Sequence, residues 1–530
     1  MGAQDVSAVL MLNGEVIAAV EEERLSRIKF SAGRLPFLAV QEVLKIGKIN
    51  IQDVSLVAFH GSTWEKEIEA RIADYFKFHF GHVPTIKRYH HHDCHAASAF
   101  YASGFDDALI LTMDNSGDGV STQVSVGEKG QIKSYQRFDR YNSLGFYYSL
   151  ITQYCGFIKD SDEFKLMGLS SYGDRNKFDF SWLIDFKDGQ LKTNKDFVLS
   201  VPPGAAPLHK DEMNFNAKVL EKMGDGRRLP GQSITQNYKN VAASAQRHLE
   251  DVVLKMLKHF VLLTGKRRIC LAGGVALNCL MNQRIMNEDF VQDFFVQPAS
   301  SDAGISLGAA WMACVEMGIA PQKTNHTYLG NSFTNDEIKT VLNQCGLKYS
   351  HLNDPAESAA ELIAQNKIVG WFQGRMEFGP RALGNRSILA NPTVPGMKTL
   401  LNEKIKLREE FRPFCPSVLE EDAPTYFEGK LLPAPYMTTT YNVVEKMINQ
   451  LPAVTQVDGT ARIQTINEGQ NSLFSHLIGN LKKKTGYGVV LNTSFNLSHE
   501  PIVSKPRHAL ATFFSSGLDA LVMGNYLVEK

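Results

Sequence analysis

Apolar segments that end in glycine-containing loops, with helical patterns after them, are the feature that most restricts the fold of this chain. The segment ALILTMDNSGDGVST predicts a buried strand that ends at Asp114 and continues into a loop with Gly117 and Gly119. The segment RICLAGG predicts a second strand, which ends at Gly273 and Gly274 before a helix. Strands that alternate with helices in this way predict an α/β protein.

Other segments agree with this class. Two apolar stretches at the start of the chain are joined by Asn13-Gly14, which predicts a β-hairpin. A helix is expected around residues 37–44, a strand in SLVAF just before His60, and a helix over residues 246–263 that leads into RICLAGG.

The composition of the chain changes after Asp354, where a helix (AESAAELIAQN) and a strand (KIVGWF) precede a dense run of arginines. Polar, turn-rich residues over 322–336 come before this change. We therefore predict two domains, residues 1–350 and a smaller α/β domain of residues 351–530.

The charge balance excludes some classes of partner. The chain has 530 residues, with 56 Lys+Arg against 56 Asp+Glu, so a chain-wide electrostatic grip on nucleic acid or membrane is not expected. No apolar run approaches membrane-spanning length, and the N-terminus has no secretory signal pattern. The seven cysteines form no CxxC pair, which favours reduced thiols and a cytoplasmic location.

The segment YHHHDCHAASAF carries candidate metal ligands. If it is helical, His91 and His95 lie on one face, where two imidazoles can bind a transition metal. Asp114 at a strand end and Asp302 before a Gly/Ala-rich helix offer carboxylate oxygens. The alternative is a polar helix face with turn and N-cap residues, and the run His90 to His92 leaves open which rings point inward.

The glycine loops are candidates for phosphate binding, because glycine lets backbone amides face a phosphate at a helix N-terminus. None of them matches the P-loop or the dinucleotide fingerprint. Lys165, in EFKLMGLSSYG, is a candidate catalytic charge. The candidate nucleotide-binding residues of these loops are Asn115, Gly117, Gly119, Gly273, Gly274 and Asn278.

The second domain predicts an anion pocket, since guanidinium groups bind phosphate and carboxylate in a bidentate manner. Its cations lie in GRMEFGPRALGNRSI, in NEKIKLREEFRPF, where they form one stripe if the helix runs up to Pro413, and in DGTARIQT. A salt-bridged surface helix is the alternative. We assign catalytic roles to Arg375 and Arg386, and phosphate-binding roles to Arg381, Lys404, Arg408, Arg412 and Arg462.

Taken together, the motifs resemble the O-carbamoyltransferases of the nodulation and antibiotic-tailoring type, over nearly the whole chain. In order, the motifs are HHDCHAASAF, DNSGDGVST, EFKLMGLSSYG, LAGGVALN, SDAGISLGAA, GRMEFGPRALGNRSIL, REEFRPFCPSV, VDGTARIQT and LNTSFNLSHEPIV. The resemblance implies an N-terminal domain of the actin- and sugar-kinase-like fold, similar to the tRNA threonylcarbamoyl-transfer enzyme. It also implies a C-terminal α/β domain similar to the threonylcarbamoyl-adenylate synthase fold.

Enzymes of this family use carbamoyl phosphate and ATP, form carbamoyl adenylate in the second domain, and pass the carbamoyl group to an acceptor hydroxyl in the first. The resemblance therefore implies an ATP-dependent transferase that acts on a small molecule, such as a sugar or a secondary metabolite. It implies that His91, His95, Asp114 and Asp302 bind a divalent metal, iron in this family. A sugar-kinase-like phosphotransferase is an alternative, and a role on tRNA is disfavoured by the zero net charge.

Two positions depart from the family pattern. The family commonly has a histidine in HD-x-SA near the N-terminus, where this chain has Gln4, and a second histidine where it has Gln456. A neutral glutamine cannot act as a base. The strand that precedes HD-x-SA in the family is also expected to be missing. These departures favour, as the alternative, a protein that binds carbamoyl phosphate and ATP without transferring a carbamoyl group. The sequence leaves open the acceptor, the metal and the oligomeric state.

Overall fold

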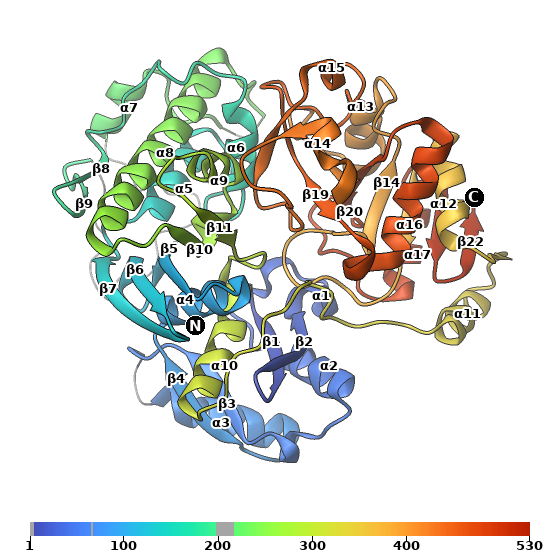
Figure 1. Cartoon of the computed structure of the whole chain (residues 1–530), viewed down its shortest axis with the longest axis horizontal. Helices are drawn as coiled ribbons and strands as arrows, with labels where there is room; N and C mark the ends of the chain where they lie inside the picture. The colour runs from blue at the N-terminus through green and yellow to red at the C-terminus, as the bar shows by residue number, and fades with distance from the viewer. Residues whose placement is uncertain (1–4, 65–66, 198–216, 230) are drawn as a thin grey trace. The chain divides into compact units, whose positions relative to one another are not determined.

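The computed structural model describes residues 5–64, 67–197, 217–229 and 231–530, so Gln4 lies outside the described residues. The chain forms two compact units (Figure 1): one contains Met1–Tyr89 and Gln297–Lys530, and the other contains His90–Val296. The domain boundary predicted near residue 350 divides the chain differently and stays a prediction. In the described part of the chain, no helix combines the length and the apolar character that a membrane crossing requires.

The unit formed by residues 90–296 is built on a five-stranded sheet. The strand order is β11 (Asp293–Val296), β10 (Arg268–Ala272), β5 (Asp107–Gly117), β6 (Val120–Glu128) and β7 (Gln131–Asp139). β10 is parallel to both β11 and β5, whereas β5, β6 and β7 form an antiparallel meander. The buried strands predicted in ALILTM and RICLA are therefore confirmed, and they lie side by side although about 160 residues separate them.

Helices cover this sheet. α4 (His91–Ser103) packs its alanines and Phe100 against Ala108 and Ile110 of β5 and against Cys270 of β10. The predicted helix before RICLAGG is α8 (Gln236–Thr264), which begins ten residues earlier than predicted. Helices α5 (Leu144–Tyr154), α6 (Glu163–Ser170), α7 (Ala217–Met223) and α9 (Cys279–Met286), the 3-10 turn η3 (Gly274–Leu277) and the hairpin β8 (Ile184–Lys187) and β9 (Gln190–Thr193) complete the unit.

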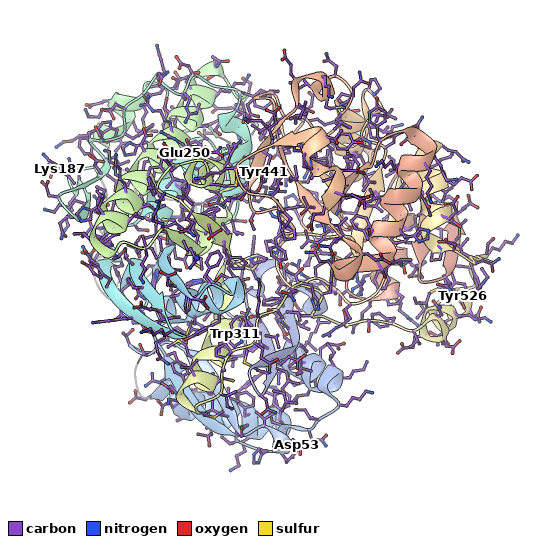
Figure 2. All side chains as sticks on the ribbon, in the orientation of Figure 1. Asp53, Lys187, Glu250, Trp311, Tyr441 and Tyr526 are labelled. Carbon is purple, nitrogen blue, oxygen red and sulfur yellow. The ribbon has the colours of Figure 1, made fainter. Side chains whose placement is uncertain are left out.

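The other unit begins with the predicted hairpin of β1 (Ser7–Leu12) and β2 (Glu15–Glu21). Asn13 and Gly14 both have positive φ, 49° and 82°, as a tight two-residue hairpin turn requires. Trp311, labelled in Figure 2, lies on α10 (Ile305–Glu316). Its indole nitrogen donates a hydrogen bond to the Gly14 carbonyl at 3.1 Å. The same part holds α1 (Glu22–Ser26), α2 (Phe37–Gly47), β3 (Leu56–His60), α3 (Glu67–Phe80), β4 (Thr85–Tyr89), and the 3-10 turns η1 (Lys29–Ser31), η2 (Ile51–Asp53) and η4 (Asp302–Gly304).

An eight-stranded mixed sheet is the core of the C-terminal part of this unit. Its order is β12 (Ser350–His351), β22 (Tyr526–Glu529), β21 (Ala520–Met523), β13 (Val369–Phe372), β14 (Arg386–Ala390), β20 (Val489–Ser494), β15 (Cys415–Leu419) and β19 (Gln464–Ile466). Helices α12 (Pro355–Ala364) and α16 (Glu468–Thr485) pack together over one hydrophobic core that includes Trp371 and Val490 of the sheet. The helix and strand predicted in AESAAELIAQN and KIVGWF are thus confirmed as α12 and β13.

The remaining elements connect and cover this sheet. They are α11 (Asn335–Gln344), α13 (Met397–Leu401), the π-helical turn η5 (Asn402–Lys406), η6 (Glu420–Asp422), α14 (Ala423–Tyr426), β16 (Phe427–Glu428), β17 (Thr440–Val443), α15 (Glu445–Ile448), β18 (Thr460–Arg462) and α17 (Pro506–Phe514). β16, β17 and β18 form a separate three-stranded sheet, so Arg462 ends one sheet immediately before β19 of the other. The α/β class predicted from the sequence is confirmed.

Candidate functional site

The histidine-rich segment is helical, as predicted. His90 is the N-cap of α4, and its Nδ1 accepts a hydrogen bond from the His92 backbone amide at 3.3 Å. The helix ends at Ser103, and its C-cap Gly104 takes the left-handed conformation with φ 69°. Alanines at 96, 97 and 99 let α4 lie close to the sheet, which buries the rings that project from its first turns.

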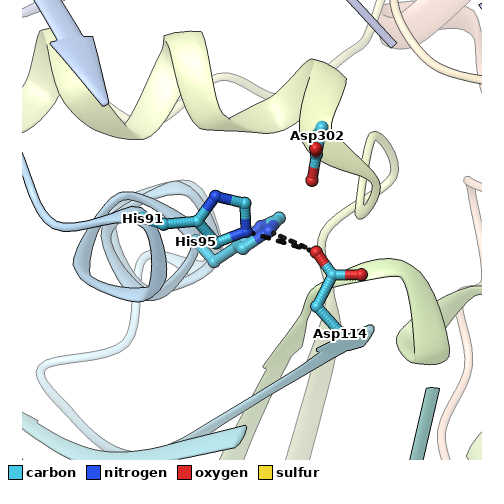
Figure 3. Close-up of side chains that lie close together, drawn as sticks. All are labelled: His91, His95, Asp114 and Asp302. Atoms are coloured by element: carbon cyan, nitrogen blue, oxygen red, sulfur yellow. Dashed lines mark hydrogen bonds and ion pairs between the residues drawn. The ribbon is translucent and has the colours of Figure 1, made fainter. Parts of the chain in front are cut away.

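His91 and His95 converge on Asp114, which lies near the C-terminal end of the central strand β5 (Figure 3). The Nε2 atoms of His91 and His95 lie 3.2 and 3.4 Å from Asp114 Oδ2, and the two ring centroids are 4.8 Å apart. Each of the three residues offers one ligand atom, and these atoms all lie within 4.8 Å of one another. Two imidazole nitrogens and a carboxylate oxygen form a donor set that suits iron, zinc and related divalent ions.

Asp302, the fourth predicted ligand, belongs to the other unit. It begins η4, directly before α10, as the sequence predicts. In the same unit, burial raises the pKa of Asp5 to about 7, although a hydrogen bond with Ser301 opposes the shift. The bounds of η4 and α10 thus place Asp302 directly before the helix, as predicted. Its role as a metal ligand stays a prediction.

The structure also answers which of the three adjacent histidines faces which way. His92 is fully buried on its own, with Nδ1 2.8 Å from Thr112 Oγ1 and Nε2 3.1 Å from the Val120 carbonyl. Burial lowers its pKa well below the usual value, and the neighbouring histidines lower it further. His92 is thus a neutral structural histidine, His90 is a cap, and His91 is the candidate ligand.

Asp114 has the electrostatic character of a ligand. Burial by itself would raise its pKa, but the hydrogen bonds and charges of His91 and His95 hold the pKa well below its usual range. The carboxylate is consequently ionised and available to a cation at neutral pH.

The predicted glycines make room for this cluster. A Cβ on Gly117 would lie 2.1 Å from the His91 ring, and a Cβ on Gly274 would lie 3.1 Å from Asp114 Oδ1. Gly273 has φ +88°, and its Cβ would meet the Met113 carbonyl oxygen at 2.1 Å. Gly119 has φ +80° and open space around it. Two of the glycines predicted to approach a phosphate therefore lie against the candidate metal ligands themselves.

The predicted polar residues of these loops lie in hydrogen-bond networks. Asn115 Nδ2 donates to Asp160 Oδ1 at 3.0 Å. Asn278 is the N-cap of α9 and exchanges hydrogen bonds with the Gln246 amide at 2.8 and 2.9 Å. Lys165 lies on α6 and forms an ion pair with Asp162 at 3.1 Å. Their predicted roles in nucleotide binding and catalysis stay predictions.

Two arginines of the GRMEFGPRALGNRSI segment hold the backbone together. Arg375 donates to the carbonyls of Ile17, Leu329 and Gly330 at 2.6 to 3.1 Å. Arg386 is fully buried, lies 3.9 Å from the Phe372 ring centroid and donates to four backbone carbonyls, those of Asn331, Gln373, Gly374 and Asn385. Burial lowers the pKa of Arg386 to about 10. These contacts assign both residues a structural role, and their catalytic role stays a prediction. Arg381, between them, is half-buried.

The prediction that Lys404, Arg408 and Arg412 form one stripe on a helix that runs up to Pro413 is wrong. The helix ends at Lys406, because Leu407 takes the left-handed conformation with φ 45° and ψ 55°. Lys404 is exposed, whereas Arg408 is half-buried against the Phe414 ring, with its guanidinium carbon 4.5 Å from the centroid. The two arginines are brought together by an irregular loop instead of by helical spacing.

Arg408, Arg412 and Arg462 form an electropositive group with Lys406, a residue that the sequence did not single out. Arg462 donates to the Cys415 thiol at 3.0 and 3.2 Å. Burial lowers the pKa of Arg408 to about 9, and the charges of Arg412 and Arg462 contribute to the shift.

Lys406 is nearly fully buried and donates to the Ser494 and Asn496 carbonyls and to the Asn496 side chain. Burial, Arg408 and Arg412 lower its pKa well below the usual value. In the sequence, Lys406 stands two residues before REEFRPF, in a segment whose cations form one stripe only if a helix runs up to Pro413.

Gln456, one of the two departures from the family pattern, lies in the turn before β18. Its backbone amide donates to the Thr460 carbonyl at 2.8 Å, and its carbonyl accepts from Gly459 at 3.0 Å. This turn leads directly into the strand that ends at Arg462. Gln456 therefore belongs to the turn that precedes Arg462, one of the grouped arginines.

Comparisons with known proteins agree along the chain. The family model for the carbamoyltransferase N-terminus matches residues 63–311, and the model for the carbamoyltransferase C-terminus matches residues 360–530. The chain is 38% identical over 559 residues to nodulation protein NolNO of Sinorhizobium fredii, and this match covers 99% of this chain and 79% of that protein. It is 40% identical over 457 residues to nodulation protein NolO of Bradyrhizobium diazoefficiens, which covers 83% of this chain and 78% of that protein.

Among solved structures, the chain is similar to full-length HypF in its phosphate- and nucleotide-bound form. The identity is 12%, the match covers 61% of this chain and 57% of that chain, and the TM-score is 0.36. The predicted α/β class is confirmed by the sheets described above, and the match to the N-terminal family model agrees with the family for which an actin- and sugar-kinase-like N-terminal domain is expected.

Proposed function

Because this chain belongs to the carbamoyltransferase family, we propose that it transfers the carbamoyl group of carbamoyl phosphate to a hydroxyl group of a small molecule. ATP supplies the activation, and carbamoyl adenylate is the intermediate. The family match shows that the chain is a carbamoyltransferase. We propose the identity of its donor, nucleotide, intermediate and acceptor.

One observation supports the donor and the nucleotide above all others: the group formed by Lys406, Arg408, Arg412 and Arg462. Cations that lower one another's pKa are electrostatically destabilised until an anion joins them. Carbamoyl phosphate and ATP are both strongly anionic, and their phosphate charge has to be neutralised before one can react with the other. One buried lysine and three half-buried arginines in one neighbourhood suit this task.

The proposed reaction balances in three steps. Water releases phosphate from carbamoyl phosphate, and an oxygen of the carbamate attacks the α-phosphorus of ATP while pyrophosphate leaves. The acceptor oxygen then attacks the carbamoyl carbon, AMP leaves, and the hydroxyl proton passes to a base. The expected products of each transfer are phosphate, pyrophosphate and AMP.

We also propose that His91, His95 and Asp114 hold a divalent metal, with Asp302 as a fourth ligand and iron as the metal. The donor set fits such an ion, as the convergence of the two Nε2 atoms on Asp114 Oδ2 indicates. A metal bound there would supply Lewis acidity toward phosphate or carbonyl oxygens. Elemental analysis of protein purified without chelators tests this part, and metal-free protein that takes up none of iron, zinc or manganese contradicts it.

The acceptor in this proposal is a small molecule, and the protein acts in the cytoplasm. Equal numbers of acidic and basic residues give no general attraction for nucleic acid. All seven cysteines are free thiols, six of them buried, as a reducing compartment would keep them.

Nucleotide product analysis tests the reaction. Purified protein is incubated with iron, ATP and labelled carbamoyl phosphate, and AMP and pyrophosphate that form only with carbamoyl phosphate support the adenylate. ADP as the product would instead indicate a phosphotransferase. ATP binding without AMP or ADP would indicate a protein that binds both ligands without transfer, the role that Gln456 favours.

A pair of variants tests whether the grouped cations bind carbamoyl phosphate or ATP. Arg412→Gln removes a half-buried guanidinium that lies 3.7 Å from Glu409. We expect the KM for carbamoyl phosphate or ATP to rise about tenfold or more, since a charge-assisted hydrogen bond to phosphate contributes about 1.5–3 kcal/mol. Arg507→Gln, on the exposed face of α17, is the matched control. Unchanged kinetics in Arg412→Gln would remove the group from the active site.

A further inference from the structure

Asn402 connects both arginines of the REEFRPF loop. It begins the π-helical turn η5 and is 1% exposed. Its Oδ1 accepts a hydrogen bond from Arg408 Nε at 2.7 Å, and its backbone carbonyl accepts from the Arg408 amide at 3.2 Å. Its Nδ2 points to the carbonyls of Arg412, at 3.3 Å, and Glu410, at 3.5 Å. One side chain thus fixes a guanidinium and the backbone of the loop that follows it.

The loop needs such a fixing group, because its own charges oppose its geometry. Arg408, Arg412, Arg462 and Lys406 lie in one neighbourhood, where their like charges repel one another. The carboxylates of Glu409 and Glu500 oppose this repulsion in part. Regular helical hydrogen bonds do not hold the loop, because Leu407 ends the helix. The contacts of Asn402 are therefore the principal described restraint on where Arg408 points. The others are the Phe414 ring and the Pro413 carbonyl, which accepts from Arg408 Nη2 at 3.1 Å.

We propose that Asn402 is a positioning residue, which holds the Arg408 guanidinium in the orientation that binds the phosphate group of carbamoyl phosphate. This inference rests on the proposed function, because it assigns the site where Asn402 acts. Asn402 itself does not have to touch the ligand. Its effect passes through the guanidinium that it orients, in the way that supporting hydrogen bonds orient catalytic groups in general.

The amide is the chemistry that this position requires. A carboxylate of the same size accepts from Arg408 but cannot donate to the carbonyls of residues 410 and 412. It also neutralises one of the cations, so it competes with the anion for Arg408. An amide accepts and donates at once and leaves the positive charge available to the ligand. Asn402→Asp therefore separates positioning from simple space filling.

The test compares Asn402→Asp with Asn391→Asp. Asn391 is also buried and also uses both ends of its amide, which donates to Asn366 Oδ1 and accepts from Thr393, but it is not part of the grouped cations. We expect Asn402→Asp to raise the KM for carbamoyl phosphate about tenfold, which corresponds to about 1.4 kcal/mol of lost binding, with a smaller change in kcat. Asn391→Asp should leave both constants near those of the wild type.

A double-mutant cycle shows whether the effect passes through Arg408. If Asn402 acts by orienting this guanidinium, Asn402→Asp combined with Arg408→Gln should bind carbamoyl phosphate no worse than Arg408→Gln alone. Additive losses, or an unchanged KM in Asn402→Asp, would overturn the inference. If Asn402→Asp does not fold, as judged from thermal unfolding, Asn402→Ser takes its place, because its hydroxyl can serve only one of these partners. Wild-type protein that makes no AMP refutes the proposed function instead, so the two failures are distinguishable.

Discussion

Replacement of Gly117 by alanine should displace His91 and weaken metal binding. The new Cβ would lie 2.1 Å from the His91 ring, whereas ordinary contact begins at about 3.4 Å, so the ring has to retreat by about 1.3 Å or the β5 end has to move. His91 Nε2 lies 3.2 Å from Asp114 Oδ2, and a retreat of this size takes the ring out of hydrogen-bond range. The steric strain should cost about 1–3 kcal/mol of folding stability without any metal.

Two assays follow the two effects. Chemical denaturation of the metal-free protein measures the loss of stability, and titration calorimetry with Fe²⁺ or Zn²⁺ measures the affinity. We expect the affinity to fall at least about tenfold, since disturbing even the groups that orient a ligand commonly costs about 10–100-fold. Gly226→Ala is the control, because Gly226 lies in the same unit, has no positive φ and has open space around its Cβ.

The reasoning is refuted if Gly117→Ala binds metal as tightly as Gly226→Ala and is equally stable. That result would mean that β5 yields without moving the ring, or that His91 is not a ligand. His91→Ala separates these cases, because a lower metal affinity in this variant shows that His91 is a ligand and that β5 yields, whereas an unchanged affinity shows that His91 is not a ligand.

Three further predictions concern the scaffold. Glu163 has its pKa raised to about 7 by burial, from an unfolded value near 4.5, so its contribution to stability is present below about pH 4.5 and is lost as the pH rises through 7. Glu163→Gln should therefore remove up to about 3 kcal/mol of pH dependence between pH 5 and 8 in denaturation curves, and parallel curves would contradict this. Arg386→Met leaves buried carbonyls unpaired and should destabilise the protein by about 3 kcal/mol or more in urea unfolding, whereas a loss under about 1 kcal/mol would contradict the structural role. Gly273→Ala forces a left-handed φ on a residue with a Cβ and a clash with the Met113 carbonyl, so a clearly lower Tm is expected, and an unchanged Tm would show that the strand end is adaptable.

Local signals in the sequence located most secondary-structure elements. Three elements depend on residues that are near one another in sequence, so they can be recognised from the sequence alone. They are the Asn13-Gly14 turn, the apolar run before Asp114 and the amphipathic helix before RICLAGG. The spacing of His91 and His95 likewise placed two rings on one helix face. The prediction failed at Lys404 to Arg412, because the π-helical turn and the left-handed Leu407 carry no strong local signal.

The sequence by itself determined the α/β class, the family and the residue types of the candidate site, because these follow from motifs and local periodicity. Only the tertiary structure decided which histidine is structural, which arginines are bound by backbone carbonyls, and that Lys406 and Asn402 stand beside Arg408. Each of these outcomes depends on which groups lie near one another after strands distant in sequence have paired. Burial and neighbouring charge are properties of that packing, and the order of residues along the chain does not contain them explicitly.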